Sequence, residues 1–431
     1  MMAEKPFSDS WADASYWWEG RTPAPDAETL PAKADVLVIG SGYTGLHAAI
    51  QTARAGMHTV VIDAGRIGEG CSTRNGGQVS TSIKPSFGSL KQKFGADTAE
   101  RIFREGQASL DFTAKFISDE AIDCDFRVVG RFHGAHSPRQ YEQLARDAEA
   151  AHPVLDTEAY IVPESEQHSE LRTDFYHGGI VFPKHASIDP GAYHAGLVEV
   201  AQQSGASLMP NCAATALAEE HVEHEVQTVR GRIRARNVIV ATNGYSGNLL
   251  PWLQHRIIPI GSYIIATEEL PKDQVDEFFP TNRIQSDTRK LVYYYRLSPD
   301  RKRILFGGRV SLRETDPRRS GPILLRDMIA IFPDLEDVRI SHSWAGTVGY
   351  TFDSLMHAGR RRGLYWAGGY CGAGAGMAGY LGNMIGRQVS GDKTATTVFS
   401  EIPFSGRPYY RGNPWFLSSS VLWYRILDRI R

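Results

Sequence analysis

One stretch near the N-terminus, residues 36–46, most constrains what this chain can fold into. Its apolar first part predicts a β-strand, and its second part carries Gly40, Gly42 and Gly45 in the spacing G-x-G-x-x-G. Gly40 permits a tight turn, Gly42 lets the backbone approach a pyrophosphate, and Gly45 lets helix and strand pack closely. Residues 47–54 predict a helix, whose N-terminus offers N–H groups to phosphates. The stretch therefore predicts dinucleotide binding.

A second strand follows this helix and ends in an acid. Gly56 closes the helix, and residues 58–62 predict a strand that runs into Asp63. Asp63 lies 23 residues after Gly40, the spacing at which a carboxylate binds the ribose hydroxyls of an adenosine. The alternative is a glycine-rich turn in an ordinary doubly wound fold.

Residues 64–78 form a loop with five glycines. Polar side chains such as Ser72, Arg74, Asn75 and Gln78 are interspersed with them. A loop so rich in backbone N–H groups and side-chain donors suits a second polar section of a long cofactor. A plain surface loop is the alternative interpretation.

A second glycine-rich turn lies near the other end of the chain. Residues 363–377 predict a strand that enters this turn, and residues 378–390 predict the following helix. Residues 236–245 predict a further buried strand with a small polar end. Two such turns, with the loop 64–78 between them in the sequence, indicate a cofactor held along its whole length. FAD in a discontinuous domain fits this better than NAD, which one contiguous unit usually binds.

Composition excludes several classes of protein. The chain has 431 residues, 42 % of them hydrophobic and 22 % charged, which is typical of a globular protein with two or three cores. A net charge of −2 gives no reason to expect nucleic acid as a partner. The four cysteines lack metal-binding spacing, so we expect no metal site and no disulfide framework. Without a signal-peptide pattern or a membrane-spanning stretch, a cytoplasmic location is expected.

The remaining elements follow from hydrophobic periodicity and turn residues. We expect an N-terminal arm pinned to the body by its aromatic side chains. The C-terminal amphipathic helix is expected to dock on its own body or on a second subunit rather than on a membrane. Helices are predicted at residues 98–118, 137–151, 189–204, 322–332 and 415–431, and strands at 126–133, 207–209, 213–219, 257–267, 291–297 and 303–309.

Together these motifs resemble the FAD-dependent D-amino-acid-oxidase/glycine-oxidase superfamily, and most of all its γ-glutamylputrescine oxidoreductase branch. The resemblance implies a discontinuous Rossmann-like FAD-binding domain and an α+β substrate domain built on a large antiparallel sheet. The matching pieces are residues 40–45, 70–78, 238–245, 261–268, 296–300, 304–309, 344–353 and 369–374. The implied segments are an arm (1–33), FAD-binding parts (34–94, 183–250, 343–400), substrate-domain parts (95–182, 251–342) and a C-terminal extension (401–431).

The resemblance also implies a reaction. A substrate amine would lose a hydride from its α-carbon to flavin N5, and the imine would hydrolyse to an aldehyde. Oxygen or an electron-transfer partner would be the acceptor, and the oligomeric state stays open. The residues assigned to the cofactor are Gly40, Gly42, Tyr43, Thr44, Gly45, Asp63, Ala64, Gly70, Cys71, Ser72, Arg74, Asn75, Gly76, Gly77, Gln78, Ala214, Ala241, Thr242, Gly369, Tyr370, Gly372, Ala373, Gly374 and Ala375.

Departures from the family pattern narrow the substrate. Amino-acid-oxidising relatives hold the substrate carboxylate with basic residues at positions that here fall near Gly77–Gln78 and Gly376, which are uncharged. A buried carboxylate without a cation costs several kcal/mol, so we expect an amine, such as an N-acylated or γ-glutamyl diamine. Leu305 stands where sarcosine-oxidising relatives carry an oxygen-activating lysine, which favours a dehydrogenase. Cys371 and Ala373 replace a serine and a histidine, and we do not expect a covalent flavin link at Cys371.

Five residues are candidates for the substrate pocket, each with core packing as its alternative: Tyr263, Tyr293, Tyr295, Arg296 and Trp344. Aromatic walls suit an apolar or cationic amine stem. Strand alternation sends Tyr293 and Tyr295 to one face and Tyr294 to the other. Two other functions compete: an amino-acid dehydrogenase or oxidase of D-amino-acid, glycine or proline type, and a flavin-binding protein without turnover.

Overall fold

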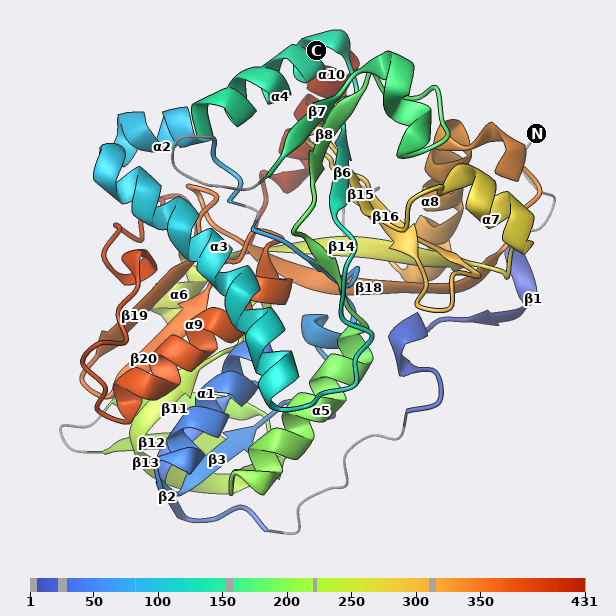
Figure 1. Cartoon of the computed structure of the whole chain (residues 1–431). Coiled ribbons are helices and arrows are strands. Elements are labelled where there is room, and N and C mark those ends of the chain that lie inside the picture. Colours follow the sequence, from blue (N-terminus) through green and yellow to red (C-terminus); the bar gives the residue numbers. More distant parts are fainter. Residues whose placement is uncertain are drawn as a thin grey trace.

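The computed structural model describes residues 6–21, 29–81, 83–151, 158–219, 223–309 and 315–430. Two large sheets dominate it, and Figure 1 shows them side by side with helices on their outer faces. This confirms the predicted mixed α/β class. Within the described residues no helix combines the length and apolar character needed to cross a bilayer.

The first sheet has eight strands and carries the glycine motif. Its central strands are parallel, and antiparallel strands are added at its edges. Helices α1 (Tyr43–Arg54), α5 (Pro190–Gln203) and α9 (Gly374–Val389) pack together on this half. The strands are β2 (Lys33–Ile39), β3 (Thr59–Ile62), β10 (Ser207–Met209), β11 (Ala214–Glu219), β12 (His224–Thr228), β13 (Gly231–Val240), β19 (His357–Arg361) and β20 (Leu364–Gly368).

The second sheet has nine strands, most of them antiparallel. Helix α8 (Pro317–Ile331) packs on it, and α7 (Lys272–Phe278) contributes buried side chains to the same core. The strands, in sheet order, are β1 (Phe7–Ala12), β18 (Ile340–Tyr350), β14 (Ile258–Thr267), β17 (Ile304–Gly308), β16 (Tyr294–Leu297), β15 (Ile284–Asp287), β6 (Arg131–Gly134), β8 (Gly179–Phe182) and β7 (Tyr160–Val162).

Smaller elements complete the fold. A three-stranded sheet joins β4 (Gln78–Val79), β9 (Ala186–Ser187) and β5 (Arg127–Val128). The other helices are α2 (Phe87–Phe94), α3 (Ala96–Asp119), α4 (Pro138–Ala151), α6 (Pro251–Gln254) and α10 (Leu417–Ile430). Most predicted elements therefore exist, with shifted ends.

Two predicted elements are wrong in form. The strand expected at 126–133 is two strands in different sheets, because Gly130 adopts a positive φ of 73° and turns the chain between them. The helix expected to begin at Pro322 begins at Pro317, where the Asp316 side chain accepts a hydrogen bond from the Arg319 N–H. Two other elements differ only at their starts: α9 begins at Gly374, before residue 378, and β16 at Tyr294, after residue 291.

The N-terminal arm is more ordered than expected. Residues 7–12 form edge strand β1 beside β18, and Trp17 is buried at 1 % exposure. The Trp17 indole donates to the Asn75 carbonyl at 2.8 Å, and the Trp18 indole donates to Thr73 Oγ1 at 2.8 Å. The aromatic residues pin the arm to the body as predicted. Its residues 22–28 lie outside the described part of the chain.

The segment boundaries expected from the sequence stay predictions, and one of them falls inside a strand. The boundary expected between residues 342 and 343 falls inside β18, whose whole length pairs in the nine-stranded sheet. We therefore propose that the second substrate-domain segment runs to Tyr350 and that the third FAD-binding segment begins after it.

Candidate functional site

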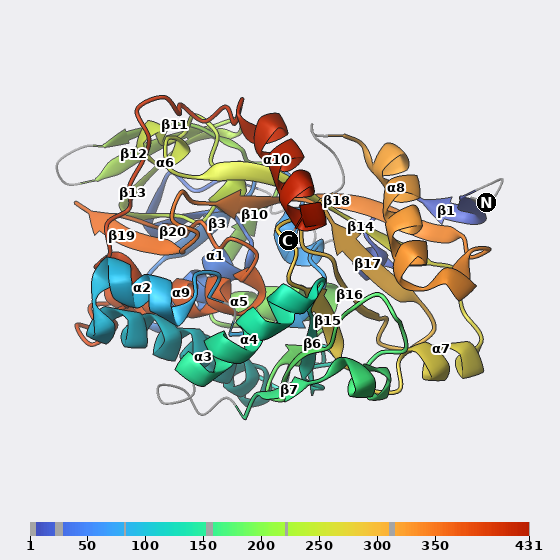
Figure 2. The same ribbon diagram turned by 90° about the horizontal axis from the view of Figure 1, so that it is seen from above.

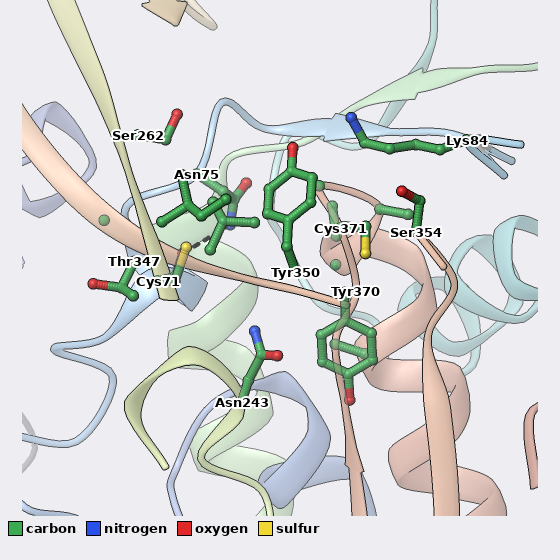
Figure 3. A pocket seen from close by; sticks show the side chains of 18 of the residues that line it. Cys71, Asn75, Lys84, Asn243, Ser262, Thr347, Tyr350, Ser354, Tyr370 and Cys371 are labelled. Carbon is green, nitrogen blue, oxygen red and sulfur yellow. Dashed lines mark hydrogen bonds between the residues drawn. The ribbon is translucent and has the colours of Figure 1, made fainter. Parts of the chain in front are cut away.

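A cavity of about 2030 Å³ runs through the molecule between the two large sheets. Ligand pockets usually have volumes of roughly 300–1,000 Å³, so this cavity has room for a long cofactor together with a substrate. One end is lined by Asp63 and Ala214, the middle by the glycine turns, and the other end by β6 and β15. Figure 3 shows its middle, where Cys71, Tyr350 and Cys371 lie around one space.

The first glycine turn is packed so closely that side chains are excluded. A Cβ atom on Gly45 would lie 1.9 Å from the Gly40 carbonyl oxygen, and one on Gly42 would lie 2.8 Å from Ser72 Oγ. Ser72 Oγ accepts a hydrogen bond from the Tyr43 N–H at 3.1 Å. The glycine turn therefore leads into the N-terminus of α1 beside the cavity, and no side chains of the three glycines cover its backbone, as a phosphate site requires.

The two glycine turns meet across the sheet. Thr44 Oγ1 and the Tyr370 hydroxyl are 2.6 Å apart, although 326 residues separate them in the sequence. On the C-terminal side, the Gly369 N–H donates to Asn243 Oδ1 at 2.8 Å. Turns from opposite ends of the chain therefore lie side by side in the fold.

The comparisons with known proteins agree with this arrangement. The sequence profile of the DAO family, described as FAD dependent oxidoreductase, matches residues 35–388. This chain belongs to the DAO family. It is an FAD-dependent oxidoreductase, and its homologues act on C–N bonds of amines and amino acids.

Several relatives resemble this DAO-family enzyme over nearly its full length. The probable oxidoreductase OrdL of Rhizobium meliloti is 32 % identical, with 96 % of this chain and 97 % of the relative covered. Gamma-glutamylputrescine oxidoreductase of Escherichia coli is 29 % identical, with 92 % and 93 % covered. Glycine oxidase from Geobacillus kaustophilus shares the fold with a TM-score of 0.72 at 17 % identity, over 88 % of this chain and all of that one.

The cavity fits the FAD that the family binds. Of the 24 residues assigned to the cofactor, 21 line it, whereas Gly45, Gly77 and Gly369 lie behind its surface. Asp63 lines the cavity, and its Oδ2 atom accepts hydrogen bonds from the Ser41 N–H at 2.8 Å and from Ser41 Oγ at 2.6 Å. The same carboxylate therefore also fixes the residue between the first two glycines.

Two of the predicted pocket residues, Trp344 and Arg296, bind the backbone of the loop at residues 64–78. Trp344 Nε1 donates to the Arg74 carbonyl at 2.9 Å. Arg296 Nη1 donates to the carbonyls of Gly77 and Ile188 at 2.9 and 2.7 Å. Neither side chain lines the cavity, and burial lowers the pKa of Arg296 to about 10. The prediction that they lie in the substrate pocket is therefore wrong, and we propose that both position the loop, because their polar atoms face its backbone.

Cys371 lies in the C-terminal glycine turn and shares the positive φ of Gly369 and Gly372. Cys371 has a φ of 53°, a region that favours glycine, and its thiol donates to the Gly369 carbonyl at 3.1 Å. Burial raises the pKa of the Cys371 thiol to about 11 and that of the Cys71 thiol likewise to about 11. Both thiols line the cavity in the protonated form, which is a poor nucleophile.

Alternation left open which face of residues 293–295 meets the site, and the structure places Tyr294, rather than the candidates Tyr293 and Tyr295, at the cavity. Tyr294 lines the cavity and its hydroxyl lies 2.9 Å from Ser262 Oγ, whereas Tyr295 is buried in the core with its hydroxyl donating to Tyr176 at 3.1 Å. The Tyr293 hydroxyl donates to Asp327 at 2.9 Å, also away from the cavity. Of the five pocket candidates only Tyr263 lines the cavity, and its hydroxyl accepts the Thr315 N–H.

Matched phenylalanine variants test this assignment. Tyr295→Phe removes a buried hydroxyl pair, so we expect a loss of about 1–2 kcal/mol in unfolding free energy and unchanged turnover. Tyr294→Phe should lower kcat/KM several-fold with little change in stability. Denaturant unfolding and steady-state kinetics on both variants measure the difference. Reduced turnover in Tyr295→Phe with intact Tyr294→Phe kinetics would reverse the assignment.

The far end of the cavity contains cations that sequence reasoning missed. The absence of charge at Gly77–Gln78 and Gly376 led us to expect no cation for a carboxylate. The structure corrects this, because other segments supply basic side chains from strands and loops distant in sequence. Arg131, Arg139, Arg289 and Lys290 line the cavity there, and Lys84 lines it beside Tyr350. Figure 3 shows the Lys84 ammonium on the upper side of the cavity, near Tyr350.

Arg289 is held in position by a carboxylate and two aromatic rings. Its Nη1 lies 3.5 Å from Asp287 Oδ2, and its guanidinium carbon lies 4.5 and 4.7 Å from the ring centroids of Phe175 and Tyr293. Asp287 is itself held by the backbone N–H groups of Tyr293 and Arg289, at 3.1 and 3.3 Å. The Arg289 side chain is 18 % exposed, and it lines the cavity. It is therefore preorganised to bind an anion.

Burial of Asp287 predicts a pH-dependent stability. Desolvation raises the pKa of Asp287 from 3.8 to about 7 in the folded protein. Between these values the unfolded chain releases a proton that the folded chain keeps, so stability falls as pH rises toward 7 and is then constant. Asp287→Asn does not titrate. The unfolding free energy of the variant minus that of the native protein should therefore rise by about 3 kcal/mol between pH 5 and pH 8. Urea unfolding of both proteins at the two pH values measures this difference. Parallel pH curves for the two proteins would contradict this.

Proposed function

We propose that this enzyme oxidises a C–N bond of an amine that also carries a carboxylate, with a γ-glutamyl diamine as the leading candidate. Arg289, fixed by Asp287 and two aromatic rings at the far end of the cavity, supports this most directly. One curated relative is named gamma-glutamylputrescine oxidoreductase. A γ-glutamyl diamine has an amine at one end and a carboxylate at the other, so it suits a long cavity with cations at one end.

Bound FAD would accept the hydride, which carries the two electrons of the oxidation. The residues of this chain bind and orient the substrate and exclude water. Arg289 binds the carboxylate, and Tyr294 and Tyr350 form walls along the amine stem. Because His133 is buried, its pKa falls to about 3 and it stays neutral. It therefore adds no charge beside the amine at neutral pH.

An amino-acid oxidoreductase is the second candidate, since the same cations could bind the carboxylate of an α-amino acid. L-proline dehydrogenase from P. horikoshii has a similar fold, with a TM-score of 0.71 at 19 % identity over 91 % of this chain and 99 % of that one. The two candidates differ in how far the carboxylate lies from the oxidised carbon.

An anaerobic substrate panel separates these functions. The flavin absorbance of the holoenzyme is followed with γ-glutamylputrescine, putrescine, glycine, proline and D-amino acids. Fastest bleaching by γ-glutamylputrescine supports the proposal, and fastest bleaching by an amino acid selects the second candidate. A flavin reduced by dithionite but by no member of the panel would indicate a protein without turnover. Admitting oxygen afterwards and timing reoxidation distinguishes an oxidase from a dehydrogenase.

We place the enzyme in the cytoplasm and in amine breakdown, such as putrescine catabolism. All four cysteines are free thiols, and three of them are buried. Free thiols are the usual state in a reducing compartment.

A further inference from the structure

The last thirty residues of the chain, 402–431, differ in character from the rest. They contain five arginines and one aspartate, a formal charge of +4, whereas the whole chain carries −2. Eleven large apolar side chains are exposed among the described residues, and six of them lie in this segment. These six are Tyr409, Trp415, Leu422, Trp423, Tyr424 and Ile426.

Helix α10 has two faces with different environments. Its inner face, with Leu417 and Val421, lines the cavity, and Asp428 accepts the backbone N–H groups of Lys290 and Leu291 at 2.8 and 3.1 Å. This docking on the body is the one expected from the sequence. Arg431, the last residue of the predicted helix, lies outside the described residues.

The outer face of α10 is apolar and exposed. Leu422 and Trp423 are 52 % and 57 % exposed, and Trp415, just before the helix, is 65 % exposed. Figure 2 looks onto α10, which lies uncovered between the halves formed by the two large sheets. Exposed side chains of this size, gathered on one helix, mark an interaction surface.

The chemistry of the segment favours an anionic lipid surface over a second copy of the chain. Tryptophan and tyrosine side chains accumulate at the boundary between headgroups and hydrocarbon, and arginines are attracted to anionic headgroups. Arg407 and Arg411 are exposed beside the aromatic residues, and the one acid, Asp428, is engaged with backbone N–H groups. Two copies meeting through this segment would instead bring together two stretches whose sequences carry net positive charge.

We propose that the outer face of α10 docks this enzyme onto the surface of an anionic lipid bilayer. The sequence alone favoured the body or a second subunit, but docking on the body occupies only the inner face. Because the inner face lines the cavity, a docked enzyme holds its cavity next to the bilayer. This inference does not depend on which amine is oxidised.

Vesicle co-sedimentation of the FAD-loaded enzyme tests the docking. We expect the enzyme to pellet with vesicles of equal parts phosphatidylglycerol and phosphatidylcholine. It should stay in solution with phosphatidylcholine alone, and high salt should release it. Failure to bind the anionic vesicles at low salt overturns the proposal.

Variants locate the surface. The double variant Leu422→Ser with Trp423→Ser should weaken partitioning into anionic vesicles at least tenfold. Its flavin spectrum, and its turnover with a soluble dye as electron acceptor, should be unchanged because neither residue lines the cavity. Val229→Ser, 64 % exposed in the turn between β12 and β13, is the matched control and should bind as the native enzyme does. Equal binding by the double variant overturns the proposal. A dimer in sedimentation velocity that the double variant dissociates would assign the face to a second copy.

Discussion

Gly45→Ala is expected to give a protein that purifies without its yellow flavin. The new Cβ would lie 1.9 Å from the Gly40 carbonyl oxygen and 3.1 Å from Val38 Cγ1. Both neighbours belong to the buried strand and turn, so neither can yield without displacing the start of α1. Overpacking of this kind costs about 1–3 kcal/mol, and the loss of FAD removes the stabilisation that a bound ligand adds. The flavin-to-protein absorbance ratio and the melting temperature measure the effect.

Gly88→Ala is the matched control for this substitution. Gly88 lies in the first turn of α2, and a Cβ there would meet no heavy atom within 4 Å. Alanine favours a helix over glycine by about 1 kcal/mol, so this variant should keep its flavin and its stability. A yellow Gly45→Ala protein with normal flavin content would mean that the turn can open, against the packing described above.

Arg289→Gln is expected to lower kcat/KM for γ-glutamylputrescine by about 10²-fold or more, while kcat/KM for putrescine changes by less than about threefold. Removing one partner of a buried charge pair costs about 2–5 kcal/mol, and each 1.36 kcal/mol is a factor of ten in rate. Putrescine has no carboxylate, so it does not use this interaction. Steady-state kinetics with both amines give the two ratios.

Arg326→Gln is the matched control for Arg289→Gln, because it removes the same charge outside the cavity. Arg326 is exposed on α8, 3.0 Å from Asp327, and does not line the cavity. Its kinetics should match those of the native enzyme with both amines. An equal loss with both amines in Arg289→Gln would show that Arg289 supports the fold or the flavin rather than carboxylate binding.

The parts of the fold that local sequence determines were predictable. The order of β2, α1 and β3 follows from a short apolar run, three glycines and a terminal acid. The Asp189–Pro190 pair marked the start of α5, and Asp189 does accept the Ala192 N–H. The same pair of residue types at Asp316–Pro317 was overlooked, although it carried the same signal for α8.

The substrate end could not be predicted in the same way, because its residues are assembled by pairing across sheets. Arg131 and Arg289 lie on or beside β6 and β15, which pair in parallel although more than 150 residues separate them. No spacing in the sequence records that register. Alternation correctly separated Tyr294 from its two neighbours, but both faces of the strand carry tyrosine, so the pattern could not tell cavity from core.

The contact between Thr44 and Tyr370 has a consequence for the order of events during synthesis. Strand β2 leaves the ribosome early, but both its neighbour β13 and the following β20 belong to much later segments. At about 5–20 residues per second, the roughly 190 residues between β2 and β13 take about 10–40 s to emerge. During that time one edge of β2, whose second half is apolar, has no partner and is prone to wrong pairing. The nascent chain should therefore depend on chaperones until its C-terminal glycine turn is complete, and only then can it acquire its cofactor.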